Sequence, residues 1–302
     1  MKILNFGSCN IDYVYSVNHI VNPGETETAD CLSIYPGGKG LNQSVAISKA
    51  GSEVYHAGCV GNNGEMLLKT LSDSGVNIKY IKMLDTANGH AVIQVSEKGE
   101  NSIFLYPGSN ERITVDFADY VLEQFGVGDI ILLQNEINNV KYIIDKAFEK
   151  EMTIVFNPSP FNDKIDVIDI NKISYLILNE VEAIGISGEE DAESIVKYFK
   201  NKYPNLKLVL TLGVKGCIYA DNSAVYSQPA YKVNAVDTTA AGDTFTGFFV
   251  SEIAKGTNIS DALKTASCAA AIAVSKKGAA SSIPDRNEVV SAFQARLAEN
   301  EK

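Results

Sequence analysis

Val236-Asp-Thr-Thr-Ala-Ala-Gly-Asp-Thr-Phe245 is a loop of small and polar residues that leads directly into a predicted helix. The helix is indicated by four apolar residues that recur at helical spacing on one face, Phe245, Phe248, Phe249 and Ile253. Gly256 follows the last of them and can end the helix in a left-handed conformation. The loop therefore delivers its residues to a helix N-terminus.

The small residues of this loop predict a binding site for an anion. Ala240, Ala241 and Gly242 have almost no side chain, so their backbone N–H groups are open to a ligand such as a phosphate. Asp243 would lie beside the same ligand, where a second negative charge is unfavourable unless the carboxylate accepts a proton from a hydroxyl that attacks a phosphoryl group. The alternative is a tight turn followed by an ordinary acidic residue in the first helical turn.

Composition limits the classes of protein to which the chain can belong. Its 302 residues, 45% hydrophobic and 21% charged, fit one large α/β domain or two smaller ones. A net charge of −11 argues against a nucleic-acid surface and against anionic membranes, although a local anion site remains possible. The five cysteines are scattered without C-x-x-C spacing, and neither a signal peptide nor a membrane-spanning run is found. We expect a cytoplasmic protein.

The second half of the chain alternates short apolar strands with helices, which predicts a parallel sheet covered by helices on both faces. Ligands of such sheets bind beyond the carboxyl ends of the strands. Each of these strands ends in a polar or glycine-rich tail, so we expect a site built from several loops. Near the C-terminus, Ser260 is predicted to cap a helix of small residues over about 261–275. The predicted strands are 129–133, 153–156, 175–178 and 208–211, and the helices between them are 140–150 and 192–202.

Two segments of the first half look like excursions from this parallel core. Residues 13–17 and 28–35 flank a turn, and residues 91–95 and 102–106 flank a loop that contains glycine. We interpret the four segments as a small sheet that covers the main domain. Three of its aliphatic or small residues would contact a substrate from above, namely Ala91, Ile93 and Leu105.

Two polar stretches precede these hairpins or connect them to the core. Asn10 and Asp12 alternate with Cys9 and Ile11 in an extended segment, so both polar side chains can point to one face and contact neighbouring hydroxyl groups of a sugar. The alternative is that they mark a polar strand end. Pro36-Gly-Gly-Lys-Gly-Leu-Asn-Gln43 leads into a helix, and Lys39 and Asn42 would face a ligand from its start. It is not a Walker A loop because Gly40 follows the lysine. A flexible turn is the alternative.

Four short motifs follow one another along the chain: Gly7-Ser-Cys-Asn-Ile-Asp12, Pro36–Gln43, Asn179-Glu-Val-Glu182 and Asp237–Phe245. In this order the chain resembles the ribokinase (PfkB-type) family of sugar kinases from Ile3 to about Pro284. The resemblance implies one catalytic domain over residues 1–302, with a mostly parallel sheet between helices and a β-sheet lid at about 13–35 and 89–106. It also implies transfer of the γ-phosphoryl group of ATP to a sugar hydroxymethyl group, with Mg²⁺ and a monovalent cation such as K⁺. Pairing through the lid as a homodimer is a further implication.

The resemblance also assigns roles to residues. Asp243 matches the catalytic base, and Ala240, Ala241 and Gly242 match the anion hole. The remaining matches fall into three groups. The sugar-binding positions are Asn10, Asp12, Gly38, Lys39, Asn42 and Glu136. The nucleotide-binding positions are Asn179, Thr211, Gly213, Gly216, Gly242 and Ser267, with Glu182 as the acid that organises Mg²⁺. The loop that holds a monovalent cation matches Asp237, Thr239, Ala273, Lys276, Gly278 and Ser282.

Three departures from the family pattern bear on the sugar. Asn135 stands before Glu136 where an apolar residue is usual, His90 stands at a usually aliphatic lid position, and the lid strand around Phe104 and Tyr106 is bulky. Among the sugars that the resemblance allows, D-ribose is the substrate that we expect. Another pentose, a deoxypentose, a hexose or a nucleoside remains an alternative, as does a non-catalytic sugar-binding regulator.

Overall fold

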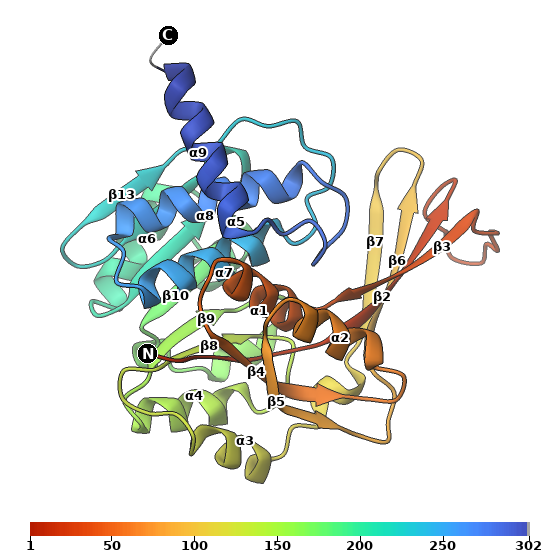
Figure 1. The fold of residues 1–302 in the computed structure, drawn as a ribbon, viewed down its shortest axis with the longest axis horizontal. Coiled ribbons are helices and arrows are strands. Elements are labelled where there is room, and N and C mark those ends of the chain that lie inside the picture. The colour runs from red at the N-terminus through yellow and green to blue at the C-terminus, as the bar shows by residue number, and fades with distance from the viewer. Residues whose placement is uncertain (301–302) are drawn as a thin grey trace.

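The computed structural model describes residues 1–300 and contains two β-sheets (Figure 1). The larger sheet has nine strands in the order β13-β12-β11-β10-β9-β8-β1-β4-β5. Its strands are β1 (Ile3–Phe6), β4 (Val54–Val60), β5 (Asn77–Met83), β8 (Ile130–Gln134), β9 (Thr153–Asn157), β10 (Tyr175–Asn179), β11 (Lys207–Thr211), β12 (Cys217–Ala220) and β13 (Val225–Gln228).

Seven neighbouring strands of this sheet are parallel, as the alternation of short apolar strands with helices predicts. In sheet order they are β11, β10, β9, β8, β1, β4 and β5. Residues 130–134, 153–157 and 175–179 are largely buried, which is why they lack a polar alternation. The sheet is thus mostly parallel, as predicted, and the exception is one edge, where β12 and β13 form an antiparallel hairpin after β11. These two strands have four residues each and were not predicted.

Helices cover both faces of this sheet, as predicted, and each face has its own apolar core. One face carries α3 (Val115–Leu122), α4 (Val140–Glu149), α5 (Glu180–Ser187) and α6 (Ala192–Lys202). The other carries α1 (Lys39–Lys49), α2 (Glu65–Asp73), α7 (Ala241–Ala254), α8 (Ile259–Val274) and α9 (Arg286–Asn300). Short 3₁₀ turns occur at η1 (Gly108–Glu111), η2 (Asp163–Val167), η3 (Ile170–Lys172) and η4 (Gly213–Lys215).

Helix α7 lies between α1 and α8 and is buried on all sides over residues 243–252. The sequence predicted only one buried face, because the threonines, Ser251 and Glu252 on the other faces are polar. The predicted cap of α8 was wrong by two residues: the side chain of Asn258, rather than Ser260, accepts the N–H of Asp261. No helix in the described part of the chain is both long and apolar enough to cross a membrane.

The smaller sheet, here called the lid, projects from the body of the molecule (Figure 1). It has four strands in the order β3-β2-β6-β7, and both predicted hairpins are present. Its strands are β2 (Asn10–Val17), β3 (Cys31–Gly37), β6 (Gly89–Ser96) and β7 (Asn101–Tyr106).

The register of the lid decides which side chains share a face. Asp12 is directly opposite Tyr35 and Ala91, and Ala91 is opposite Leu105, so these four side chains lie on one face, the inner face. Ile93 is two residues further along β6 on the same face. His90, Phe104 and Tyr106 have the other parity and lie on the opposite, outer face.

Candidate active site

The loop that precedes α7 lines the same cleft as the carboxyl ends of β10 and β11. Ala240 is the N-cap of α7 and adopts a left-handed conformation, with φ of 58°. Within the described chain, the N–H groups of Gly242 and Asp243 have no hydrogen-bond acceptor. Two free donors at the N-terminus of a fourteen-residue helix can bind an anion. The sequence predicted open N–H groups at Ala240, Ala241 and Gly242, but the N–H of Ala241 donates to the carbonyl of Thr238 at 3.3 Å.

Asp243 is buried, with 7% of its surface exposed, and both of its carboxylate oxygens are held by side-chain amides of α1. Asn42 Nδ2 donates to Oδ2 at 3.1 Å, and Gln43 Nε2 donates to Oδ1 at 2.9 Å. The other polar atom of Asn42, Oδ1, is buried and has no hydrogen-bond partner within the described chain. An unpaired buried acceptor beside a carboxylate suits a ligand that supplies hydroxyl donors.

Asn10 and Asp12 lie at the start of β2, against the glycine loop that precedes α1. A Cβ at residue 37 would collide with the carboxylate of Asp12, and a Cβ at residue 38 would lie 2.9 Å from the backbone N of Asn10. Gly38 also has φ of 93°, which side chains rarely allow. The glycines at 37 and 38 therefore bring the helix start and the base of the lid into contact.

Glu136 connects two of the predicted motifs. Its Oε2 accepts the hydroxyl of Ser8 and, at 2.8 Å, the backbone N–H of Lys39. Burial raises the pKa of Glu136 above its ordinary value, against the opposing effects of Lys39 and Ser8. Sequence reasoning placed Glu136 near the sugar but missed Ser8, which holds it.

Four carboxylates, those of Asp12, Glu136, Asp243 and Glu182, lie in this region together with Lys39. The pKa of Asp12 is raised to about 7, first by burial and then by the charges of Glu136 and Asp243. Burial alone would lower the pKa of Lys39, but the nearby charges of Asp243, Glu136 and Glu182 outweigh it and raise that pKa. The positive charge of Lys39 therefore offsets part of the negative charge of these carboxylates.

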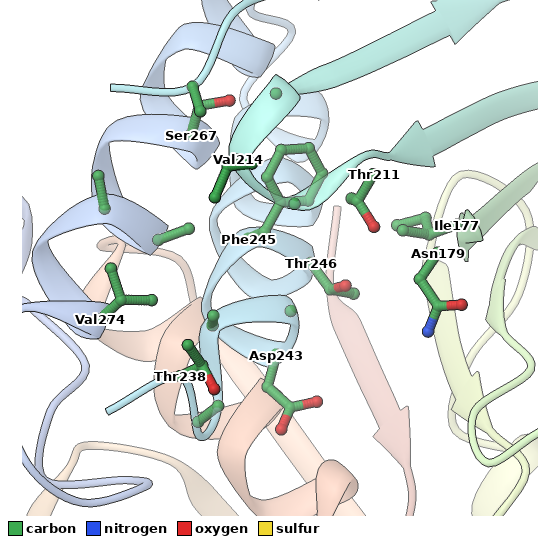
Figure 2. Close-up of a pocket in the computed structure, with 18 of the residues that line it drawn as sticks. Ile177, Asn179, Thr211, Val214, Thr238, Asp243, Phe245, Thr246, Ser267 and Val274 are labelled. Atoms are coloured by element: carbon green, nitrogen blue, oxygen red, sulfur yellow. The ribbon is translucent and has the colours of Figure 1, made fainter. Parts of the chain in front are cut away.

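A cleft of about 800 Å³ opens on the other side of Asp243, between α7, α8 and the ends of β10 and β11 (Figure 2). Figure 2 shows Asp243 and Thr238 at one end of this cleft and Asn179 and Thr211 across from them. Eleven of the predicted residues line the cleft: Lys39, Asn179, Glu182, Thr211, Gly213, Gly216, Ala240, Ala241, Gly242, Asp243 and Ser267.

The residues predicted to organise Mg²⁺ and those predicted to hold a monovalent cation lie in different surroundings. Glu182 is buried and forms a capping box with Asn179 at the start of α5, so it is fixed on the cleft wall. Asp237 lies outside the cleft, where its carboxylate accepts the N–H groups of Thr239 and Gly278, at 2.9 Å each. Asp237 thus ties together two segments, around Thr239 and around Gly278, that were predicted to hold a monovalent cation.

Two further residues complete the site and were not predicted. Asn110 Nδ2 donates to Asn10 Oδ1 at 2.7 Å, and its own Oδ1 accepts the N–H of Cys9 at 3.0 Å. Asn157 accepts from Gln43 at 3.0 Å. Both follow predicted strands in the sequence, and a polar residue just after a strand was the available signal.

Comparison with known proteins agrees with this geometry. The family model for pfkB family carbohydrate kinases matches residues 1–286. A ribokinase of Bacillus subtilis is 35% identical over 294 residues, which cover 95% of this chain and 98% of that protein. The crystal structure of a Cryptococcus neoformans ribokinase in complex with ADP has a TM-score of 0.85 and 31% identity, covering 96% of this chain and 99% of that one. An Arabidopsis thaliana ribokinase complexed with ribose and ATP has a TM-score of 0.84 and 26% identity, covering 96% and 97%. The chain belongs to the pfkB family of carbohydrate kinases.

Proposed function

We propose that this protein transfers the γ-phosphoryl group of ATP to the O5 hydroxyl of D-ribose and so produces ribose 5-phosphate. The observation that carries the proposal is the position of Asp243. It lies at the N-terminus of α7, between the 800 Å³ cleft and the polar groups at the base of the lid. A nucleotide in the cleft and a sugar under the lid would therefore meet at this carboxylate.

Each group of this site has a defined task in the proposed reaction. Asp243 takes the proton of the attacking hydroxyl, as a general base. The free N–H groups of Gly242 and Asp243 bind the oxygens of the transferring group. Mg²⁺ would be organised from Glu182 and would neutralise charge on the phosphates. Closure of the lid would exclude water that otherwise hydrolyses ATP.

The sugar side of the site favours a small polyhydroxylated substrate. The carboxylate of Asp12 and the unpaired Oδ1 of Asn42 supply acceptors for hydroxyl donors, while Ala91 and Leu105 lie on the same lid face as Asp12. An absent hydroxyl would leave such buried acceptors unpaired, which disfavours substrates that lack it. Deoxyribose, a hexose or a nucleoside is the second candidate, and a substrate panel discriminates these.

The departures from the family pattern lie away from the sugar positions. His90, Phe104 and Tyr106 occupy the outer face of the lid, opposite to Asp12. Asn135 donates to the Pro160 carbonyl at 2.7 Å and to Asn162 at 3.0 Å, so it holds a neighbouring loop. These positions therefore do not argue against ribose, although sequence reasoning counted them against it.

The outer face of the lid also supports a homodimer. It exposes Leu32, Ile34, Phe104 and Tyr106, each by 47% or more. An extended face with this many exposed apolar side chains is typical of a surface that another protein covers. The proposal includes pairing of two chains through their lids, one catalytic domain per chain, K⁺ as activator at the Asp237 loops, and a cytoplasmic location.

The replacement Asp243→Ala tests the proposal. ADP release with ATP, Mg²⁺, K⁺ and ribose should become undetectable, because the general base is lost, while ribose and ATP still raise the melting temperature of the variant. Near-normal turnover by the variant would contradict the catalytic assignment. A wild-type protein that binds ribose without releasing ADP would instead be a sugar-binding regulator.

A further inference from the structure

A row of buried side-chain amides extends from the carboxylate of Asp243 into the sheet. Gln43 Nε2 donates to Asp243, Gln134 Nε2 donates to Gln43 Oε1 at 2.7 Å, and the same Nε2 donates to Asn5 Oδ1 at 2.9 Å. These three amides are each 0 or 1% exposed. They come from α1, β8 and β1, three elements that surround the site. Buried polar groups of this kind cost stability unless they are paired, so the row calls for an explanation.

We propose that Gln43 is a positioning residue for Asp243, and that Gln134 and Asn5 fix the orientation of the Gln43 amide. The inference rests on the role of Asp243 as the general base of the proposed kinase reaction. It assigns to these three amides the task of holding the carboxylate in one rotational state.

The row has a single self-consistent direction, because both ends can only accept. At one end Asn5 Nδ2 donates to the backbone carbonyl of Gly40 at 2.7 Å, so Asn5 Oδ1 must face Gln134. Gln134 donates from its Nε2 to both Asn5 and Gln43. Gln43 Oε1 therefore faces Gln134, and Gln43 Nε2 faces the carboxylate of Asp243. A donor is therefore aimed at the base from a backbone anchor about three side chains away.

A second anchor prevents Gln43 from turning over. Gln43 Nε2 also donates to Asn157 Oδ1, and Asn157 Nδ2 donates to the backbone carbonyl of Ile177 at 3.0 Å. A flipped Gln43 would place its Oε1 against two acceptors, Asp243 Oδ1 and Asn157 Oδ1. Its nitrogen would then face the donor Nε2 of Gln134. The flip would replace three hydrogen bonds by repulsive contacts, so the amide is locked.

The row ends in neutral groups. Asn5 Nδ2 donates to Ser44 Oγ at 2.8 Å, and the Ser44 hydroxyl is 2.8 Å from His56 Nδ1. Complete burial lowers the pKa of His56 to about 4, so His56 is uncharged at neutral pH. The row therefore brings no second charge to Asp243, and it acts by orienting the carboxylate.

The consequence for the reaction is a fixed carboxylate. Gln43 holds Oδ1, and Asn42 holds Oδ2 while its own Oδ1 has no partner within the described chain. The Oδ2 side is therefore the side on which a sugar hydroxyl can join the site. Without Gln43 the carboxylate can rotate about its side-chain bonds, and fewer bound complexes have a lone pair directed at the hydroxyl.

The test compares Gln43→Met and Gln134→Met with Thr244→Val. Thr244 is also fully buried beside Asp243, but its hydroxyl has no partner among the described residues, so this control removes a buried polar group outside the row. In the ADP-release assay with ribose, Gln43→Met should lower kcat by about 10- to 100-fold and Gln134→Met by a smaller factor. KM values for ribose and ATP should stay within about twofold, and Thr244→Val should keep kcat within about twofold.

Non-additivity separates positioning from general loosening. The double variant Gln43→Met/Gln134→Met should be no slower than Gln43→Met, because Gln134 acts through Gln43. An unchanged kcat in Gln43→Met, an equal loss in Thr244→Val, or multiplied losses in the double variant would overturn the inference. Gln134→Glu, which removes the fixed donor with almost no change in shape, replaces Gln134→Met if that variant does not fold, with the same expected outcome.

The failure of this inference is distinguishable from failure of the proposed function. If Asp243→Ala is inactive while Gln43→Met is normal, only the positioning role is wrong. If Asp243→Ala retains normal turnover, the catalytic base itself is wrongly assigned, and the positioning role fails with it.

Discussion

Replacement of Asp12 by asparagine should stabilise the ligand-free protein more at pH 8 than at pH 5. Asp12 is partly buried at the base of the lid, and its pKa is raised from 3.8 to about 7 by burial, Glu136 and Asp243. The folded state therefore binds a proton at this carboxyl group more tightly than the unfolded state does. Between pH 3.8 and 7 the folded state holds more protons, so this group makes stability fall as pH rises through that window.

The magnitude follows from the shift. From 3.8 to about 7 is roughly three pKa units, at about 1.4 kcal/mol each, so the full cost above pH 7 has an upper limit of about 4 kcal/mol. Between pH 5 and pH 8 the cost should grow by about 2 to 3 kcal/mol. The asparagine side chain of the variant does not titrate, so the stability difference between variant and wild type should increase by this amount. The variant should also bind ribose poorly, because it has lost a carboxylate acceptor.

Urea unfolding followed by circular dichroism at pH 5, 6, 7 and 8, without ligand, measures the difference directly. Asp30→Asn is the matched control, since Asp30 is an exposed carboxylate in the loop that joins two strands of the same lid. Its stability difference from the wild type should stay constant with pH. A constant difference for Asp12→Asn as well would refute the reasoning that three crowded carboxylates are kept in place for ligand binding at the expense of stability.

Three further predictions concern the loops and the lid. Gly38→Ala should lower the free energy of unfolding by about 1–3 kcal/mol, because Gly38 has φ of 93° and an added Cβ would contact the backbone of Asn10. Gly126→Ala is the control and should change the free energy of unfolding little, because there is open space around Gly126. Equal effects of the two variants in urea unfolding would contradict this prediction. Asp237→Ala should raise the K⁺ concentration needed for half-maximal activity by at least about tenfold, since two loops lose their common acceptor, and an unchanged K⁺ response would exclude this site. Phe104→Asp should convert a dimer to a monomer in sedimentation velocity, and a dimer that persists would place the interface elsewhere.

The fold was predictable where periodicity was strong and neighbours were close in the sequence. Helix α6 has the predicted bounds of 192–202, because its apolar residues follow one helical period and its ends carry capping signals. The β12–β13 hairpin was missed, because four-residue strands offer too few positions for an alternation to be recognised. The polar residues of α7 concealed its complete burial, which depends on the distant helices α1 and α8.

The site was predictable where a residue's type and its place after a strand suffice. Asp243, Asn179 and Thr211 follow strand or loop patterns and line one cleft, as predicted. The roles of Gln43 and Asn5 could not be assigned from sequence, because their common partner Gln134 lies 91 or more positions away from each of them. The face that His90 occupies also depends on the lid register, which composition does not reveal.

The measurement that tests the central proposal most directly is ADP release by the wild-type protein with ATP, Mg²⁺ and K⁺. The panel comprises ribose, 2-deoxyribose, fructose, ribulose and several nucleosides. The proposed function predicts the highest kcat/KM with ribose, because the carboxylate of Asp12 and the unpaired Oδ1 of Asn42 can accept its hydroxyl groups. Turnover that is faster with a nucleoside or another sugar, and negligible with ribose, would contradict it.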